Sequence, residues 1–492
     1  MSSARAELAA LLLGALTVCG FAPFHLFPLP LATLALLFAL WRAAATVRQA
    51  AWLGWLWGFG CFLGGVSWIY VSMHDVGGML APLAAAATLS FCAYLALFPA
   101  FAGGLFRHFQ SGSAWRDALL LAGLWALGEW LRGWLFTGFP WLALGYAQSP
   151  PSPLAGYAAL LGVYGIGLIL AALAALLTYA WRRPGAWLAL ACVAACGQML
   201  LQVAWTQPSG AALTVSLLQG NISQDSKWDQ ERLQDSLLGY ARLARAHPAQ
   251  LVVLPETALP MFLDDVPSDY LQALLASGPA LFGVAVSSGE VGKPESYANA
   301  AVAMTAGMPL QVYAKSHLVP FGEYVPPGFS WFLALLRMPM SDFSPGAPHQ
   351  PPLQIAGQLV APNICYEDLF GEEILQSLPQ ATLLINLSNT AWFGDSLAQP
   401  QHLQIAQLRA LETGRYMLRA TNTGMTAIVQ PDGVVAAALP AFTAAALNAE
   451  VRGYTGMTPF ARWGNTLALL LAACAVLPAV RQRRLTTARK GG

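Results

Sequence analysis

Three side chains that can take part in acyl transfer stand at the ends of short, apolar, β-branched segments in the central part of the chain. They are Glu256, Lys315 and Cys365, and the predicted strands before them cover residues 251–254, 311–314 and 358–364. In layered α/β folds, functional sites assemble at the carboxyl ends of strands. A carboxylate can remove the thiol proton, the thiolate can attack a carbonyl carbon, and an ammonium group can stabilise the oxyanion. Together the three residues predict a nucleophilic acyl-transfer site.

Cysteine usage singles out Cys365. The chain has seven cysteines, and the other six lie in long apolar segments, at positions 19, 61, 92, 192, 196 and 474. No disulfide can therefore form within the polar region, residues 208–455. A lone thiol in an oxidising compartment is either a buried, inert side chain or a working nucleophile. The cysteine count leaves both open, just as Glu256 taken singly could cap a helix and Lys315 could be a surface residue.

The elements that must position these residues alternate between strands and helices. Nine predicted strands cover residues 212–218, 251–254, 280–286, 297–304, 311–314, 358–364, 381–387, 417–420 and 425–429. Predicted helices cover residues 229–247 and 399–413, where apolar side chains recur near helical spacing. Strands and helices in alternation predict a layered α/β domain.

The rest of the chain is apolar. Of the 492 residues, 57% are hydrophobic and only 10% are charged, against roughly a quarter charged in soluble domains. A wholly soluble or disordered protein is therefore excluded. Eight apolar segments cover residues 8–24, 26–41, 51–71, 79–105, 118–136, 154–180, 186–205 and 463–480. Most are long enough to cross a hydrocarbon core of about 30 Å, which predicts seven membrane helices before the polar region and an eighth after it.

Charge predicts the orientation of these segments. Residues 208–455 carry 11 Lys or Arg and 20 Asp or Glu, a net charge of −9, which disfavours nucleic-acid binding. The remainder carries 14 basic and 4 acidic residues. With a cytoplasmic N-terminus, 12 of those 14 lie on the cytoplasmic side: residues 5, 42, 48, 107, 116, 182, 183, 481, 483, 484, 489 and 490. Cytoplasmic loops are enriched in Lys and Arg, so the polar region is expected to face outward. A cleaved signal peptide at residues 8–19 is the alternative for the first segment.

In order and position, Glu256, Lys315 and Cys365 resemble the catalytic triad of the nitrilase superfamily. Over essentially its full length the chain also resembles the apolipoprotein N-acyltransferase family. The matching segments are residues 219–222 with Lys227 and Trp228, 254–258, Lys315 with 318–326, 364–367 and 388–395. Thr257 departs from the family pattern, where an alanine is common. The combination is specific, whereas each fragment alone is weak.

The resemblance implies a polytopic, eight-helix membrane domain together with an α/β nitrilase-like domain that forms an αββα sandwich. The expected divisions are residues 1–206 with seven transmembrane helices, 207–457 as a periplasmic catalytic domain, and 458–492 as the eighth helix with a basic cytoplasmic tail. The expected location is the bacterial inner membrane.

The resemblance also implies an activity in two steps. Cys365 would take an acyl chain from a phospholipid, with phosphatidylethanolamine the expected donor, and form a thioester. The α-amine of the diacylglyceryl-cysteine of an apolipoprotein would then accept the chain. Glu256 would act as general base, Lys315 would stabilise the oxyanion, and Glu323 would be a further essential carboxylate. No cofactor is implied.

Further residues match positions of the family that bind substrate. They are Trp228, Tyr366, Glu367, Trp392, Phe393 and Gly145. The aromatic residues among them suit an entrance that touches lipid, but interfacial anchoring or core packing would explain Trp228, Trp392 and Phe393 as well. Gly145 is expected to let the backbone approach lipid or a lid. Glu129 and Arg132, three residues apart on one helix face, can pair, and a structural ion pair is favoured over a functional one.

Two other functions remain open. A membrane-tethered amidase would use the same triad with water as second nucleophile, although one helix would suffice to tether it. A transporter with an outward binding domain would leave Cys365 inert, and would need more polar residues within its helices. A thiol reagent should block both enzymes but not transport. The histidines have no metal-ligand spacing, so no metal is expected.

Overall fold

The computed structural model describes residues 3–224, 230–287, 296–326, 328 and 342–488. The chain forms two compact units. One contains Met1–Tyr70, Pro82–Val203 and Arg462–Gly492, and the other contains Val71–Ala81 and Ala204–Ala461.

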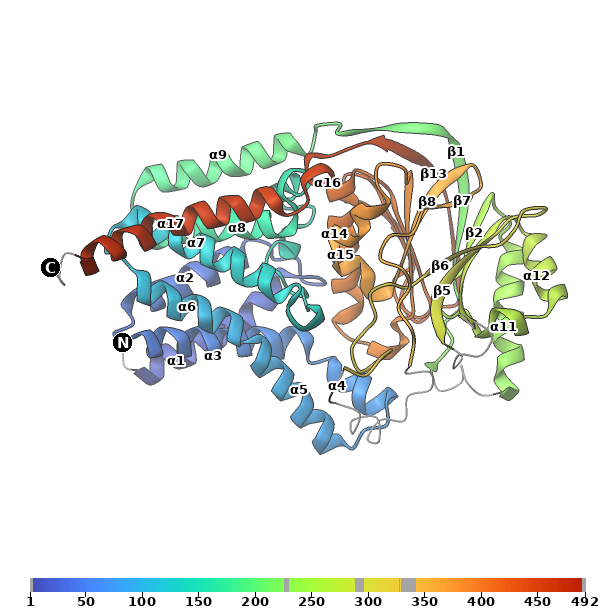
Figure 1. The fold of residues 1–492 in the computed structure, drawn as a ribbon, viewed down its shortest axis with the longest axis horizontal. Helices are drawn as coiled ribbons and strands as arrows, with labels where there is room; N and C mark the ends of the chain where they lie inside the picture. The colour runs from blue at the N-terminus through green and yellow to red at the C-terminus, as the bar shows by residue number, and fades with distance from the viewer. Residues whose placement is uncertain (1–2, 225–229, 288–295, 327, 329–341, 489–492) are drawn as a thin grey trace. The chain divides into compact units, whose positions relative to one another are not determined.

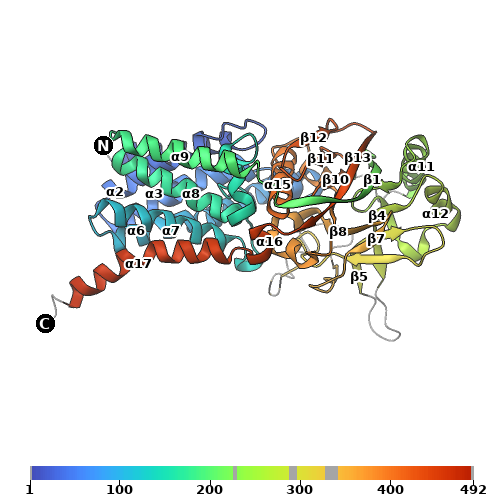
Figure 2. The same ribbon diagram turned by 90° about the horizontal axis from the view of Figure 1, so that it is seen from above.

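The first unit is helical. Its longer helices are α1 (Ser3–Thr17), α2 (Leu29–Ala43), α3 (Val47–Val66), α5 (Ala81–Leu95), α6 (Leu97–Phe109), α7 (Ala114–Arg132), α8 (Ala158–Ala180), α9 (Pro184–Leu200) and α17 (Thr466–Ala488). Helix α3 packs against α1 and α6, while α7 packs against α6, α8 and α17 (Figures 1 and 2). Each of the eight predicted apolar segments overlaps one or two of these helices.

Among the described residues, three helical segments are long and apolar enough to cross a membrane: Ser3–Gly20, Ala81–Phe109 and Pro153–Ala180. A fourth arises if Val47–Val66 and Ile69–Val76, which meet at a bend of 57°, count as one span. Helices such as α2 are shorter, since 15 residues extend about 22 Å. The predicted location of apolar helices is therefore confirmed, while the count of eight membrane spans stays a prediction.

Glu129 and Arg132 bind the loop that follows their helix, α7. Both residues are buried. The guanidinium group of Arg132 donates hydrogen bonds to the carbonyl oxygens of Phe139 and Trp141, and the N–H of Leu144 donates to Glu129 Oε1 at 2.8 Å. These contacts give both charged residues a structural role in binding the loop, while the ion pair between them stays a prediction.

In its described residues, the second unit contains two β-sheets. The first has the strand order β13-β1-β2-β4-β5-β6, with β3 also paired to β4. Its strands are β1 (Thr206–Gln219), β2 (Leu251–Val253), β3 (Leu259–Phe262), β4 (Ala280–Ser287), β5 (Tyr297–Met304), β6 (Gln311–Ala314) and β13 (Ala445–Gly456). Strands β1, β2 and β4 are parallel, and β5 is antiparallel to both β4 and β6. The carboxyl ends of β2, β4 and β6 therefore point the same way.

The second sheet has the order β12-β11-β10-β9-β8-β7. Its strands are β7 (Leu353–Ile355), β8 (Gln358–Ile364), β9 (Leu383–Ser388), β10 (Met417–Thr421), β11 (Ala427–Val429) and β12 (Val435–Ala438). Its three central strands, β8, β9 and β10, are parallel. As in the first sheet, side chains that follow these strands gather at one edge.

The two sheets face each other across a shared apolar core that includes Val253, Leu281, Ile364 and Leu418. Helices α11 (Gln230–Ala246) and α12 (Ser268–Leu275) cover the outer face of the first sheet (Figure 1). Helices α14 (Gly371–Ile374) and α15 (Ala398–Thr413) cover the second. This arrangement confirms the predicted αββα sandwich.

Candidate active site

The three sequence-predicted residues meet where strands of both sheets end. Glu256 follows β2 and Lys315 follows β6 in the first sheet, whereas Cys365 follows β8 in the second. The turn at Glu256 packs tightly on β4, because a Cβ atom added at Gly283 would lie 2.6 Å from the Cα of Glu256. Only glycine allows so close an approach of two backbones.

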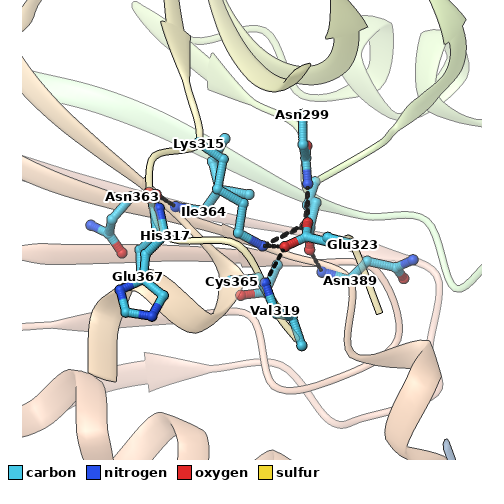
Figure 3. A network of polar contacts seen from close by, with 12 residues as sticks. Asn299, Lys315, His317, Val319, Glu323, Asn363, Ile364, Cys365, Glu367 and Asn389 are labelled. Carbon is cyan, nitrogen blue, oxygen red and sulfur yellow. Dashed lines mark hydrogen bonds and ion pairs between the residues drawn. The ribbon is translucent and has the colours of Figure 1, made fainter. Parts of the chain in front are cut away.

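Lys315 forms the centre of a buried ionic cluster. Its side chain is 1% exposed, and its Nζ lies 2.8 Å from each oxygen of Glu323 and 3.6 Å from Glu256 Oε1. The amide of Asn299 donates hydrogen bonds to Glu256 Oε1 at 2.7 Å and to Glu323 Oε1 at 2.9 Å (Figure 3). One ammonium group and one amide thus connect both carboxylates.

The other two carboxylate oxygens are bound by the backbone. The N–H of Asn389 donates to Glu256 Oε2 at 2.7 Å, and the N–H of Val319 donates to Glu323 Oε2 at 2.8 Å. With the Asn299 amide, these donors hold each oxygen of Glu256 and of Glu323 in a defined direction.

The electrostatics of the cluster keep Lys315 charged and Cys365 protonated. Burial alone would lower the pKa of Lys315, but Glu323 and Glu256 raise it above its ordinary value. Burial, together with the charge of Glu256, raises the pKa of the Cys365 thiol well above its ordinary value, and Lys315 opposes this only in part. At neutral pH the thiol therefore needs a base to remove its proton. Within the part of the chain that the structure describes, no three His, Cys, Asp or Glu side chains group to hold a metal ion.

Cys365 has a left-handed backbone conformation, with φ of 53°. Such a conformation costs about 1–2 kcal/mol for a residue other than glycine, so the surrounding contacts must enforce it. The N–H of the preceding Ile364 donates to Glu367 Oε2 at 2.7 Å, and the amide of Asn386 donates to the carbonyl of Cys365 at 3.2 Å. Cys365 thus occupies a strained turn that is bound from two sides.

Glu367, predicted to bind substrate, is directed into the protein. Its carboxylate accepts hydrogen bonds from the N–H groups of Ile364, Ser316 and His317, at 2.7, 2.7 and 3.2 Å, and from the hydroxyl of Tyr313. Burial raises the pKa of Glu367, although Lys315 and these backbone donors oppose the shift. The side chain connects the segment after β6 to the turn after β8, and so places Lys315 relative to Cys365 (Figure 3).

Three aromatic residues predicted to bind substrate, Tyr366, Trp392 and Phe393, lie close in the chain to residues of this cluster. The ring centroid of Tyr366 lies 5.7 Å from that of His317 and 5.1 Å from that of Phe370. Trp392 and Phe393 belong to a 3₁₀ turn, Thr390–Phe393, that directly follows Asn389, and both are half-buried. Their proposed contact with substrate stays a prediction. Trp228 lies outside the described residues.

Gly145 belongs to the first unit, where its surroundings explain the absence of a side chain. A Cβ atom there would lie 2.1 Å from the carbonyl oxygen of Val163. The close backbone approach expected at Gly145 is thus an approach to helix α8. It requires neither lipid nor a lid.

Asn299 is the site residue that sequence reasoning missed. It is a buried amide within the otherwise apolar strand β5, and a buried polar group needs hydrogen-bond partners. That single polar residue in an apolar strand was the available signal. Its partners could not be inferred, because Glu256 and Glu323 come from other segments.

Comparisons with known proteins agree with this architecture. The family model described as apolipoprotein N-acyltransferase N-terminal domain matches residues 13–176, and the one described as carbon-nitrogen hydrolase matches residues 214–459. The chain is 51% identical to the apolipoprotein N-acyltransferase of Nitrosomonas europaea, over 96% of each chain. It is 49% identical to that of Ralstonia nicotianae, over 96% of this chain and 93% of the relative.

Among solved structures, the chain is similar to the C. elegans NitFhit protein, with 16% identity and a TM-score of 0.39 over 50% of this chain and 61% of that one. The family assignment rests on the two family models and on the identity to relatives along nearly the whole chain. The chain belongs to the apolipoprotein N-acyltransferase family.

Proposed function

We propose that this protein transfers an acyl chain from a phospholipid to the α-amine of the diacylglyceryl-cysteine of apolipoproteins, through a thioester on Cys365. The observation that carries the proposal is the strained, buried cysteine on which the charges of Glu256 and Lys315 both act, with the carboxylate and the ammonium group fixed in direction. The family membership supports the choice of substrates, since the relatives are named for this transfer.

In the first half-reaction, Glu256 takes the proton of the Cys365 thiol as the sulfur attacks the ester carbonyl of the phospholipid. Lys315 stabilises the charge that develops on the carbonyl oxygen. The tetrahedral intermediate then collapses, the C–O bond breaks, and Glu256 returns its proton to the departing lysophospholipid. The products are an acyl thioester on Cys365 and a lysophospholipid.

In the second half-reaction, the α-amine of the acceptor attacks the thioester carbonyl. Glu256 removes a proton from the attacking nitrogen, and Lys315 again stabilises the oxyanion. The C–S bond breaks, the sulfur recovers a proton from Glu256, and an amide is released. One base and one cation serve both steps in a ping-pong scheme.

In this scheme, Glu323 orients the ammonium group of Lys315 and keeps it charged. An ammonium group has three N–H donors. One N–H can be shared between the two Glu323 oxygens, which are both 2.8 Å from Nζ, and a second can point toward Glu256, which leaves a third for the oxyanion. Glu323 also keeps Lys315 protonated, because its charge raises the pKa of the ammonium group. The cation is therefore charged before substrate arrives.

The substrates require a site at the membrane surface, since exposing an acyl chain to water costs about 0.8 kcal/mol per CH₂. The proposal therefore includes a membrane domain at residues 1–206 with seven spans, a periplasmic catalytic domain at 207–457, and an eighth span with a cytoplasmic tail at 458–492. The basic residues clustered near alternate loops support this orientation in the inner membrane. Phosphatidylethanolamine is the proposed acyl donor.

The thioester provides the test. Purified protein is incubated with phosphatidylethanolamine of one chain composition and no apolipoprotein, and its intact mass is measured. We expect a gain of one acyl group on Cys365, reversal by hydroxylamine, discharge by an apolipoprotein amine, and no gain in Cys365→Ala. Steady release of free fatty acid without an adduct would favour the amidase. If neither adduct nor lipid cleavage occurs, the enzyme proposal is wrong and the transporter alternative returns.

A further inference from the structure

A second polar cluster lies behind the nucleophile, in the interior of the second unit. Its members are Asp368, His402, Arg419 and Asn386, and each is at most 1% exposed. They come from the turn after β8, from helix α15, and from strands β10 and β9. The two half-reactions assign no role to this cluster.

The hydrogen bonds of Arg419 determine the protonation of His402. Arg419 Nη2 lies 2.8 Å from His402 Nδ1, and His402 Nε2 lies 2.7 Å from Asp368 Oδ1. A guanidinium group can only donate, so Nδ1 accepts and the imidazole proton is on Nε2, where it is donated to Asp368. Burial and the charge of Arg419 both lower the pKa of His402, which favours this neutral form.

Arg419 also determines the orientation of the Asn386 amide. Arg419 Nη1 donates to Asn386 Oδ1 at 3.0 Å, and the hydroxyl of Ser388 donates to the same oxygen at 2.6 Å. With its oxygen directed to these two donors, Asn386 must direct its NH₂ group the other way. That group donates to Asn363 Oδ1 at 2.7 Å and to the carbonyl oxygen of Cys365 at 3.2 Å.

The cluster thus ends on the backbone of the nucleophile. The Asn386 amide binds the carbonyl oxygen of Cys365, the residue whose backbone φ is 53°. Figure 3 shows Cys365 close to Lys315 and Glu323. The proposed acyl transfer depends on this closeness. A rotation of this peptide would move the sulfur relative to Glu256 and Lys315. Misplacement of about 1 Å can cost about 100-fold in rate.

We propose that Arg419, His402 and Asp368 form a positioning device that orients the Asn386 amide, and through it keeps Cys365 in the conformation that acyl transfer requires. The inference rests on the proposed function, because acylation of Cys365 is the reaction whose rate would test it. Stability alone does not call for such a device, because a buried ion pair can often be replaced by apolar residues without loss.

The test compares two substitutions of equal length. Glutamine in His402→Gln can accept from Arg419 and donate to Asp368, whereas methionine in His402→Met can do neither. The rate constant for acylation of Cys365 is measured by intact mass over a range of phosphatidylethanolamine concentrations. We expect His402→Met to lose about 10- to 100-fold in the saturating rate constant, with unchanged half-saturating phospholipid. His402→Gln should remain within about threefold of wild type.

A merely structural role gives another pattern. It would lower the fraction of protein that becomes acylated and the melting temperature, while the folded fraction would react at the wild-type rate constant. That result, or an equal loss in His402→Gln and His402→Met, would overturn the proposal. If His402→Met does not fold, Arg419→Lys decides. Arg419 binds Asn386 and Asp368 through Nη1 and His402 through Nη2. Lysine has a single terminal nitrogen and cannot occupy both positions, so the rate constant should fall.

Alkylation separates this proposal from the proposed function. Iodoacetamide needs the same proton transfer from Cys365 to Glu256, but no lipid. If wild type forms no thioester, the proposed function fails, and the device is then judged by alkylation alone. Slower alkylation of Cys365 in His402→Met than in His402→Gln would support the device, and equal rates would contradict it.

Discussion

At the scale of single residues, the most consequential contact is that between Lys315 and its two carboxylates. We expect Lys315→Met to lose about 10²- to 10³-fold in the acylation rate constant, by analogy with the loss of one oxyanion donor. Sequence reasoning also predicts an intact fold for this variant. The structure argues otherwise, because Glu256 and Glu323 would then be buried beside each other without a cation.

Leaving a buried charge unpaired costs about 3–5 kcal/mol, so Lys315→Met should also melt at a lower temperature. The double variant Lys315→Met, Glu323→Gln removes one of the two stranded charges. It should recover much of the stability and none of the activity. Arg452→Met, on an exposed position of β13, is the control. Normal turnover by Lys315→Met would exclude Lys315 from catalysis.

The raised pKa of Cys365 makes a prediction about pH. A thiol whose pKa is higher in the folded than in the unfolded protein stabilises the fold below its unfolded pKa of about 8.5. That contribution is lost as pH rises toward the folded pKa, because the unfolded thiol ionises first. Wild type should therefore lose melting temperature relative to Cys365→Ala between pH 7 and pH 10. A constant difference across that range would mean that the folded thiol titrates normally.

At the scale of elements, Glu367 connects the segment after β6 to the turn after β8. Glutamine has the same shape, but its NH₂ group would face the N–H donors of Ser316, His317 and Ile364. We expect Glu367→Gln to destabilise the protein by about 1.5–3 kcal/mol, and to slow acylation because Lys315 and Cys365 separate. Thermal melting and intact mass measure the two effects. Glu450→Gln, at an exposed position of β13, should change neither quantity. If Glu367→Gln also leaves stability and acylation rate unchanged, the connecting role of Glu367 is wrong.

The close approach of β4 to the Glu256 turn gives a second prediction at this scale. In Gly283→Ala the new Cβ would meet both Glu256 Cα and Pro255 O at 2.6 Å. The turn must move, which we expect to cost about 1–3 kcal/mol and to lower the acylation rate. Gly239 in α11 has open space around it, so Gly239→Ala should leave activity unchanged and raise stability by up to about 1 kcal/mol. Equal activity of the two variants would show that the position of Glu256 tolerates movement.

At the scale of the whole molecule, the distribution of basic residues predicts topology. A reporter that is active only outside the cytoplasm should work when fused after Trp205 and fail when fused after Lys490. The reason is that 12 of the 14 basic residues outside the polar region lie on one side of the predicted spans. Activity of the Lys490 fusion would show that the orientation is the reverse of the predicted one. The catalytic domain would then have no access to periplasmic acceptors.

At the same scale, several strands of the fold were not predicted from the sequence, and their composition or their short length explains why. Strand β13 contains Ala445, Asn448 and Glu450, residue types that are depleted in strands. It forms only because it pairs along β1, more than 200 residues earlier in the chain. The short strands β3, β7 and β12 likewise depend on a neighbour for their definition.

The sequence by itself determined the properties that depend on residues near each other in the chain. These are the apolar helices, the alternation of strands with helices, the charge asymmetry, and the three reactive groups at strand ends. Local patterns suffice there because hydrophobic periodicity and strand ends are read within a few residues. The order of Glu256, Lys315 and Cys365 then indicated one chemistry.

Only the tertiary structure decided which groups touch. Asn299 bridges two carboxylates from other segments, Glu367 faces inward to the segment after β6, and Arg419 acts on Cys365 through Asn386. A hydrogen bond between residues distant in the chain depends on how two sheets and their connections pack, and a buried polar group accepts whichever partner that packing brings near. For this reason the reactive residues were predictable, while the contacts that orient them were not.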